Sequence, residues 1–155
     1  MATKVFGLDR LKRKLKRFPA VVEAEIKAAI EQSANEIVAL AKSLVPTDSG
    51  DLRNSIAWTY GDAPQGAIIL GKVKSSSSGN LRITVFAGGP DAYYARFIEF
   101  GTAPHLNGGR FAGSKNPGTA AQPFFYPAYR ASRKRARGRV TRAVNKAAKR
   151  VAAGG

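Results

Sequence analysis

The chain has 155 residues, of which 44% are hydrophobic, and a formal net charge of +16. This length allows one moderate core, and the apolar content excludes a chain that is intrinsically disordered throughout. The chain contains no cysteine, which excludes disulfide bonds, thiolate catalysis and thiolate metal ligation.

The excess positive charge lies at the two ends of the chain. Residues 1–18 contain seven Lys/Arg and one acid, and residues 128–155 contain ten Lys/Arg and no acid. Residues 19–127 contain nine residues of each sign and are neutral. Solvated helix faces explain the N-terminal run, but ten cations without an acid repel one another. We therefore expect a basic end to meet a polyanion or an acidic protein surface.

Neither targeting nor membrane signals stand out. The basic start of the chain is not followed by the apolar segment of a signal peptide, so we expect none. No apolar run approaches the roughly 20 residues that span a bilayer. We expect a soluble protein without a membrane partner.

The first predicted elements are helical. Residues 8–18 are typical of a short basic helix or arm, and Pro19 either ends it or opens the next helix. Residues 20–44 have apolar side chains at the helical period. We expect these to be buried against a sheet with Trp58, Ile83 and Val85 among their contacts; they are Val22, Ile26, Ile30, Ile37 and Leu44.

Pro46 stops this helix, and a short capped helix follows within "TDSGDLRNSI". Three stretches then have strand character, at 56–60, 67–73 and 81–87. The polar, Gly-containing segments between them, "GDAPQG" and "KSSSSGN", are predicted to be hairpin loops.

Residues 91–100 predict a helix with Tyr94, Phe97 and Ile98 on one side and Gly101 as its C-cap. Residues 103–121 have few core-forming side chains, and we expect a neighbouring subunit to give them their shape. The last helix is expected from near Pro127 to about Val151. Its apolar stripe would comprise Tyr129, Ala136, Val140, Val144, Ala147 and Val151.

This order predicts a single α+β domain. A small antiparallel sheet of about three to four strands would pack against a long N-terminal helix and a long basic C-terminal helix. The domain would comprise an N-terminal basic arm (1–18), an α+β body (19–127) and the basic C-terminal helix (128–155).

Few residues offer catalytic chemistry. His105 is the only histidine and has no obvious orienting acid, so a surface or local hydrogen-bonding role is expected. The carboxylates of Asp48, Asp51 and Glu99 could meet as a metal or acid–base site. The first two have a capping explanation, and Glu99 could pair with Arg53 or Arg96. We expect no catalytic residue, cofactor or metal.

The basic C-terminal helix is the remaining functional signal. Because aromatic residues are not interleaved with its cations, base stacking is not indicated, and any nucleic acid would be contacted by charge alone. The candidate contacts to DNA or an acidic partner are Arg130, Arg133, Lys134, Arg135, Arg137, Arg139 and Arg142.

Three motifs between about Ala34 and Tyr129 resemble the small neck or tail-completion proteins of long-tailed, lambda-like bacteriophages. "VPTDSGDLRNSI" matches through Pro46, Asp48, Gly50, Leu52 and Ser55, with Arg53 inside it. "YARFIEFGT" matches through Tyr94, Ala95, Glu99, Phe100, Gly101 and Thr102. "AQPFFYPA" matches through Pro123, Phe124, Pro127 and Ala128.

The resemblance implies a non-enzymatic virion protein, made in the host cytoplasm, that forms a ring at the head–tail junction. It implies six subunits, passage of DNA through the ring, and a connector, tail terminator or tape-measure protein as neighbour. The basic ends and the long 103–121 segment are not part of the pattern. The alternative is a bacterial accessory protein that binds nucleic acid without sequence preference and forms no ring.

Overall fold

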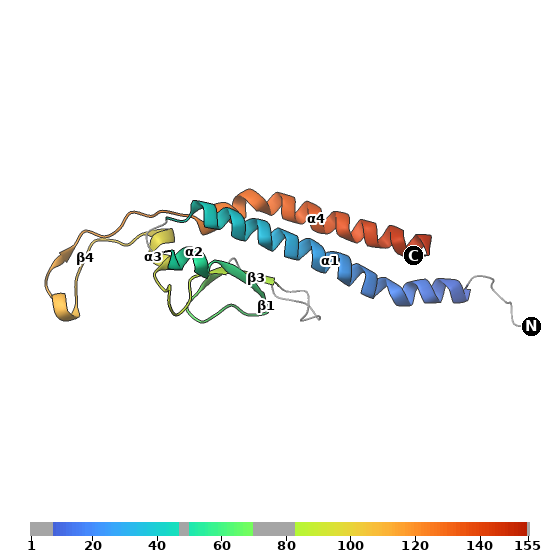
Figure 1. Cartoon of the computed structure of the whole chain (residues 1–155), viewed down its shortest axis with the longest axis horizontal. Coiled ribbons are helices and arrows are strands. Elements are labelled where there is room, and N and C mark those ends of the chain that lie inside the picture. Colours follow the sequence, from blue (N-terminus) through green and yellow to red (C-terminus); the bar gives the residue numbers. More distant parts are fainter. Residues whose placement is uncertain (1–7, 47–49, 70–82, 155) are drawn as a thin grey trace, which may run out of the picture. The chain divides into compact units, whose positions relative to one another are not determined.

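The structure, a computed structural model, describes residues 8–46, 50–69 and 83–154 of the chain (Figure 1). It is α+β, as predicted. The chain divides into two compact units. The helical unit contains residues 8–33 and 134–154, and the body contains the described part of residues 34–133. The elements in chain order are α1 (Leu8–Leu44), α2 (Asp51–Ser55), β1 (Ala57–Tyr60), β2 (Ile68–Ile69), β3 (Ile83–Ala87), α3 (Ala95–Phe100), β4 (His105–Leu106), η2 (Gly109–Phe111), β5 (Lys115–Asn116) and α4 (Phe125–Ala153).

The first helix, α1, is one helix of 37 residues where the sequence predicted two. Pro19 lies inside it and does not end it. Proline removes one backbone donor and disfavours the preceding turn, which is why it predicts a boundary. The helix continues because the apolar period resumes directly after the proline and its next turns pack against α4.

The body contains a three-stranded antiparallel sheet with β3 in the centre, in the order β1-β3-β2. Trp58 lies opposite Val85, and Ile69 opposite Phe86. The three predicted strands are therefore present, although residues 70–82, with the predicted "KSSSSGN" loop, lie outside the described residues. The "GDAPQG" segment is not a hairpin loop, because β1 and β2 both pair with β3 and not with each other.

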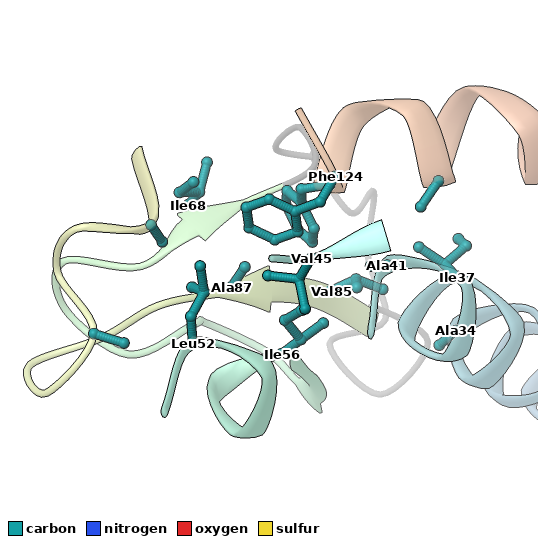
Figure 2. Close-up of a cluster of buried hydrophobic side chains, with 14 residues drawn as sticks. Ala34, Ile37, Ala41, Val45, Leu52, Ile56, Ile68, Val85, Ala87 and Phe124 are labelled. Atoms are coloured by element: carbon teal, nitrogen blue, oxygen red, sulfur yellow. The ribbon is translucent and has the colours of Figure 1, made fainter. Parts of the chain in front are cut away.

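The core of the body is formed by the end of α1, α2, the three-stranded sheet, the α3 region and the start of α4 (Figure 2). Its largest fully buried side chains are Phe124, Phe125 and Ile56. The end of α1 contributes four residues at spacings of three and four, which are Ala34, Ile37, Ala41 and Val45. Val85 is buried with them, and Trp58 and Ile83 pack against the cluster, as predicted.

The predicted burial of α1 was wrong at several positions. Leu44 is 45% exposed because Val45, not Leu44, continues the buried spacing into the body. Val22, Ile26 and Ile30 are half-buried and belong to the helical unit, so they do not contribute to the core beneath the sheet.

The helical unit is an antiparallel pair formed by α1 and α4. Glu25 contacts Lys146 and Arg150, and Ser33 contacts Arg139, so the residue numbers run in opposite directions along the pair. Mostly small side chains line the contact, since the buried positions are Ala29, Ser33, Ala143, Ala147 and Val151.

The last helix, α4, begins two residues before Pro127, where the sequence predicted its start. Its buried stripe includes Ala143, while Val140 and Val144 are only half-buried.

Residues 102–119 form a β-hairpin, which we call the arm. Thr102 pairs with Thr119, His105 with Asn116 and Leu106 with Lys115, and η2 lies at the tip. Local bonds such as Asn107 N–H to the Ser114 carbonyl (2.9 Å) hold the tip. The segment therefore has hydrogen-bonded structure of its own, and the expectation that a neighbouring subunit gives it its shape stays a prediction.

Within the three described stretches, no helix combines the length and apolarity needed to cross a membrane.

Candidate functional site

The first motif forms the turn into α2 and the helix itself. Gly50 has a positive φ of 80°, and its carbonyl accepts a hydrogen bond from Asn54 N–H at 2.9 Å. A positive φ favours glycine because side chains with a Cβ are strained there. Leu52 is 3% exposed and enters the core, whereas Arg53 is exposed. Pro46 is half-buried at the end of α1, and Asp48 lies outside the described residues.

Ser55 joins this motif to the turn before α3. Its hydroxyl donates to the Leu52 carbonyl at 2.6 Å and accepts from Gly88 N–H at 2.9 Å. A Cβ at Gly88 would lie 2.8 Å from the Ala92 carbonyl oxygen and 2.9 Å from the Ala95 Cβ. The hydroxyl of Ser55 therefore holds a close approach that only glycine permits.

Glu99 joins the second motif to the third. It is 3% exposed, and its two carboxylate oxygens accept three backbone hydrogen bonds at the start of α4. One oxygen accepts from Phe124 N–H at 2.8 Å and from Phe125 N–H at 2.9 Å. The other accepts from Tyr126 N–H at 3.0 Å.

With these bonds, each backbone N–H group at the N-terminus of α4 has an acceptor. The first four N–H groups of a helix lack intrahelical acceptors, and here the four positions are Phe124 to Pro127. Glu99 accepts from the first three, and Pro127, the fourth, has no N–H. The negative charge also faces the positive end of the helix dipole. Glu99 is thus a buried helix cap supplied by a distant part of the chain.

This geometry decides between the roles that the sequence left open for Glu99. It forms no ion pair with Arg53 or Arg96, both of which are exposed; its partners are backbone N–H groups. Three backbone N–H groups of α4 bind its two oxygens, so the role that the structure shows for Glu99 is that of a helix cap. Among the described residues, no three His, Asp or Glu side chains gather as a metal site requires.

The remaining motif residues surround this cap. Tyr94 is half-buried against the core, and Phe100, although 58% exposed, has its ring 5.7 Å from that of Tyr126. A Cβ at Gly101 would lie 2.6 Å from the Thr119 carbonyl oxygen, so glycine lets the two strands of the arm approach. Thr102 exchanges backbone bonds with Thr119 at 2.9 and 3.1 Å. Pro123 is exposed directly before the buried Phe124.

Two sequence predictions near the arm have different outcomes. His105 is exposed, and its Nδ1 lies 2.9 Å from the Ala103 carbonyl oxygen, which confirms a local hydrogen-bonding role. Phe97 does not share the inner side of α3 with Tyr94 and Ile98, because it is 48% exposed. The inward side of α3 carries Ala95 and Glu99, and Phe97, two residues from each, lies on the outer side.

The seven candidate cations of α4 do not form one patch. Arg130, Arg133, Lys134 and Arg137 follow spacings of three, four and seven residues, which place them on one face of the helix, and all are exposed. We call this the basic face. Arg135, Arg139 and Arg142 follow spacings of four and seven and lie on another face.

Arg139 of the second set takes part in the structure of the helical unit, as do two later cations of α4. The half-buried Arg139 donates to the hydroxyl of Ser33 at 2.8 Å, and that hydroxyl donates to the Ala29 carbonyl at 2.8 Å. About two and three turns further along α4, Lys146 and Arg150 lie 3.2 and 2.6 Å from the carboxylate of Glu25. Hydrogen bonds from Arg150 and Lys146 lower the pKa of Glu25. Charge alone predicted neither contact, because the partner of Arg139 is a neutral hydroxyl and Glu25 is distant in sequence from Lys146 and Arg150.

Comparison with known proteins found a match to a protein family. Residues 9–101 match the model of the HK97-gp10-like family, described as "Bacteriophage HK97-gp10, putative tail-component". No curated protein and no solved structure matches the chain. The matched span contains the first motif and the second motif as far as Gly101, directly before the arm.

The match covers more than half of the chain and agrees with the phage resemblance of the sequence motifs. It favours a structural part of the virion over a bacterial accessory protein. The chain belongs to the HK97-gp10-like family of bacteriophage tail components.

Proposed function

We propose that this tail component forms a ring, most simply of six subunits, at the head–tail junction, and that DNA passes through the ring. The observation that carries the proposal is the basic face of α4. Four exposed cations share one helix face, and residues 128–155 contain no acid to neutralise them. Their mutual repulsion favours a position opposite a polyanion.

The basic face suits the DNA backbone better than the other cationic face does. Phosphate contacts need only exposed Lys/Arg side chains, and they give affinity that is independent of sequence and sensitive to salt. On the other face, Arg139 binds Ser33, and the nearby Lys146 and Arg150 bind Glu25. Those cations hold the helical unit together, so the basic face remains for a partner outside the chain.

The body supports a structural and non-enzymatic role. Two of its polar motif residues, Ser55 and Glu99, bind the backbone of distant segments. These bonds fix the shape of the subunit surface, as a ring component needs. The connector, the tail terminator or the tape-measure protein would then be the neighbour along the tail axis.

Duplex DNA binding by two charge-matched variants tests the proposal. K134Q/R137Q removes one Lys and one Arg from the basic face, and R142Q/K149Q removes one of each from elsewhere on α4. The slope of log K against log salt should fall by about 2 for the first variant, at roughly 0.9 per phosphate contact. It should change by less than about half as much for the control.

Equal losses of slope in the two variants would contradict the assignment of the basic face. Wild-type protein that binds DNA without salt dependence, or not at all, would remove DNA from the proposal. Native mass spectrometry of the same samples at high salt tests the ring independently, because screening phosphate contacts leaves subunit contacts between apolar surfaces in place.

A further inference from the structure

We propose that the arm of one subunit docks on α3 of a second copy of this chain. The proposal rests on the proposed ring and names one of the contacts that would build it. The arm has large apolar side chains in solvent, since Leu106 is 67% and Phe111 68% exposed. Large exposed apolar groups that lie together mark interaction surfaces.

The arm is already ordered for such a contact. Both strands are paired, and the Asn107 amide donates to the Ser114 hydroxyl at 2.9 Å. The base of the arm is fixed where Gly101 and Gly118 approach the opposite strand more closely than a Cβ allows. A segment that is ordered before binding loses little conformational entropy on docking. The arm therefore presents Phe111 without the need to fold first.

The surface around α3 offers a complementary aromatic face. Phe97 and Phe100 are three residues apart in α3, which places them on one side of the helix, and they are 48 and 58% exposed. Tyr93, in the turn directly before α3, is 68% exposed. The inner side is occupied by Ala92, Ala95 and Glu99, which are buried. We call the outer side the aromatic face.

The chemistry of the two surfaces matches. Residues 102–122 contain Arg110 and Lys115 but no acid, and Arg110 precedes Phe111 at the tip. A guanidinium is attracted to the faces of aromatic rings. The exposed Asp91, two residues before Tyr93, adds an opposite charge at the edge of the aromatic face. Arg96 also lies on this face, so the match comes from the rings and Asp91 and not from net charge.

A second copy is the occupant because one chain contains both surfaces and its own arm points away from α3 (Figure 1). The five exposed side chains would bury roughly 500 Å² at about 100 Å² each, below the roughly 1,600 Å² of a standard interface. One arm contact is therefore weak alone and adds to other contacts. Because the two surfaces differ, the contact is head-to-tail, the kind that closes rings.

Cysteine cross-linking tests this contact directly, since the native chain has no cysteine. A112C places a thiol beside Phe111, and R96C places one among the aromatic residues of α3, and both positions are exposed. The two single variants are mixed under mild oxidation, so every cross-link joins different copies. A112C mixed with N54C, at an exposed position on α2, is the control. A112C–R96C dimers should form at least about tenfold faster than control dimers.

Native mass spectrometry of the same mixtures separates this proposal from the ring. Preferential A112C–R96C cross-links support arm docking, whether the oligomers are closed rings or open chains; open chains contradict only the ring. An oligomer without that cross-link, or with faster A112C–A112C dimers, overturns arm docking and leaves the ring. Monomers at all concentrations without cross-links overturn both. As a second variant, L106S/F111S should weaken self-association about tenfold or more while its melting temperature stays unchanged.

Discussion

The body and the helical unit keep their shapes by different means. The body buries two phenylalanines and an isoleucine completely, and its motif residues bind the backbone across the core. The helical unit buries mostly alanine along its contact and adds contacts from Glu25 and Arg139. Hydrophobic stabilisation follows buried apolar area. This chain therefore concentrates its buried apolar area in the body, whereas the helical unit depends on small side chains and polar contacts.

A cavity in the body should have the largest effect on stability. Phe124→Ala removes a fully buried ring, and the cost should be about 3–5 kcal/mol of unfolding free energy. Denaturant unfolding of the full chain measures it. The control Phe111→Ala, at the 68% exposed tip of the arm, should cost less than about 0.5 kcal/mol. Similar costs for the two variants would mean that Phe124 is not in a packed core.

Loss of the α4 cap should rank second. Glu99→Gln keeps the size of the side chain but removes the charge and replaces one acceptor with a donor that faces backbone N–H groups. We expect a loss of about 2–3 kcal/mol, since hydrogen bonds to charged groups are the stronger ones. Asp91→Asn, at an exposed carboxylate, is the matched control and should be near neutral. A neutral Glu99→Gln would show that the cap does not matter to stability.

Overpacking of the helical contact should have a smaller effect. Ala147 is fully buried between α1 and α4, so Ala147→Leu should cost about 1–3 kcal/mol. Ala152→Leu adds the same side chain at an exposed position five residues later and should be tolerated. Thermal melts followed by circular dichroism compare the two. If both variants melt alike, the small-residue contact is not tightly packed.

The ion pairs of Glu25 should give the smallest effect and a defined pH dependence. Because the pKa of Glu25 is lowered in the folded chain, its stabilising contribution is present above the unfolded pKa of about 4.3 and is lost as pH falls below it. Exposed pairs contribute little, so the difference between wild type and Glu25→Gln should be small. Melting temperatures from about pH 6 to pH 3 should converge at the acid end. Glu23→Gln, at an exposed site, should follow wild type throughout.

The sequence predicted the class of fold, the three strands and both long helices, because hydrophobic period and turn residues are local signals. It did not predict that Glu99 caps α4, since an acid in sequence has no visible partner when that partner is backbone 25 residues away. Pro19 and Leu44 misled for a related reason. Pro19 predicted a helix boundary, but α1 continues through it and packs against α4. Leu44 was predicted to be buried, but Val45 occupies the buried position instead.

The cations of α4 show the same limit of prediction from local sequence. Composition grouped seven of them, yet helical spacing and the partners of Arg139 divide them between two faces. The arm was not predicted from the sequence either, because its strands are only two residues each and turn hydrogen bonds give it its order. Its glycines and its Asn residues were the available signal, since they favour tight turns.

An image of the assembled particle, at a resolution that shows helices, tests the central claim most directly. We predict a ring of this subunit between head and tail, with the basic face of α4 toward the DNA channel or toward an acidic neighbour. A subunit found as a ring with that face in bulk solvent, far from DNA and from any acidic surface, would contradict it. The charge of α4 would then have no partner in the virion.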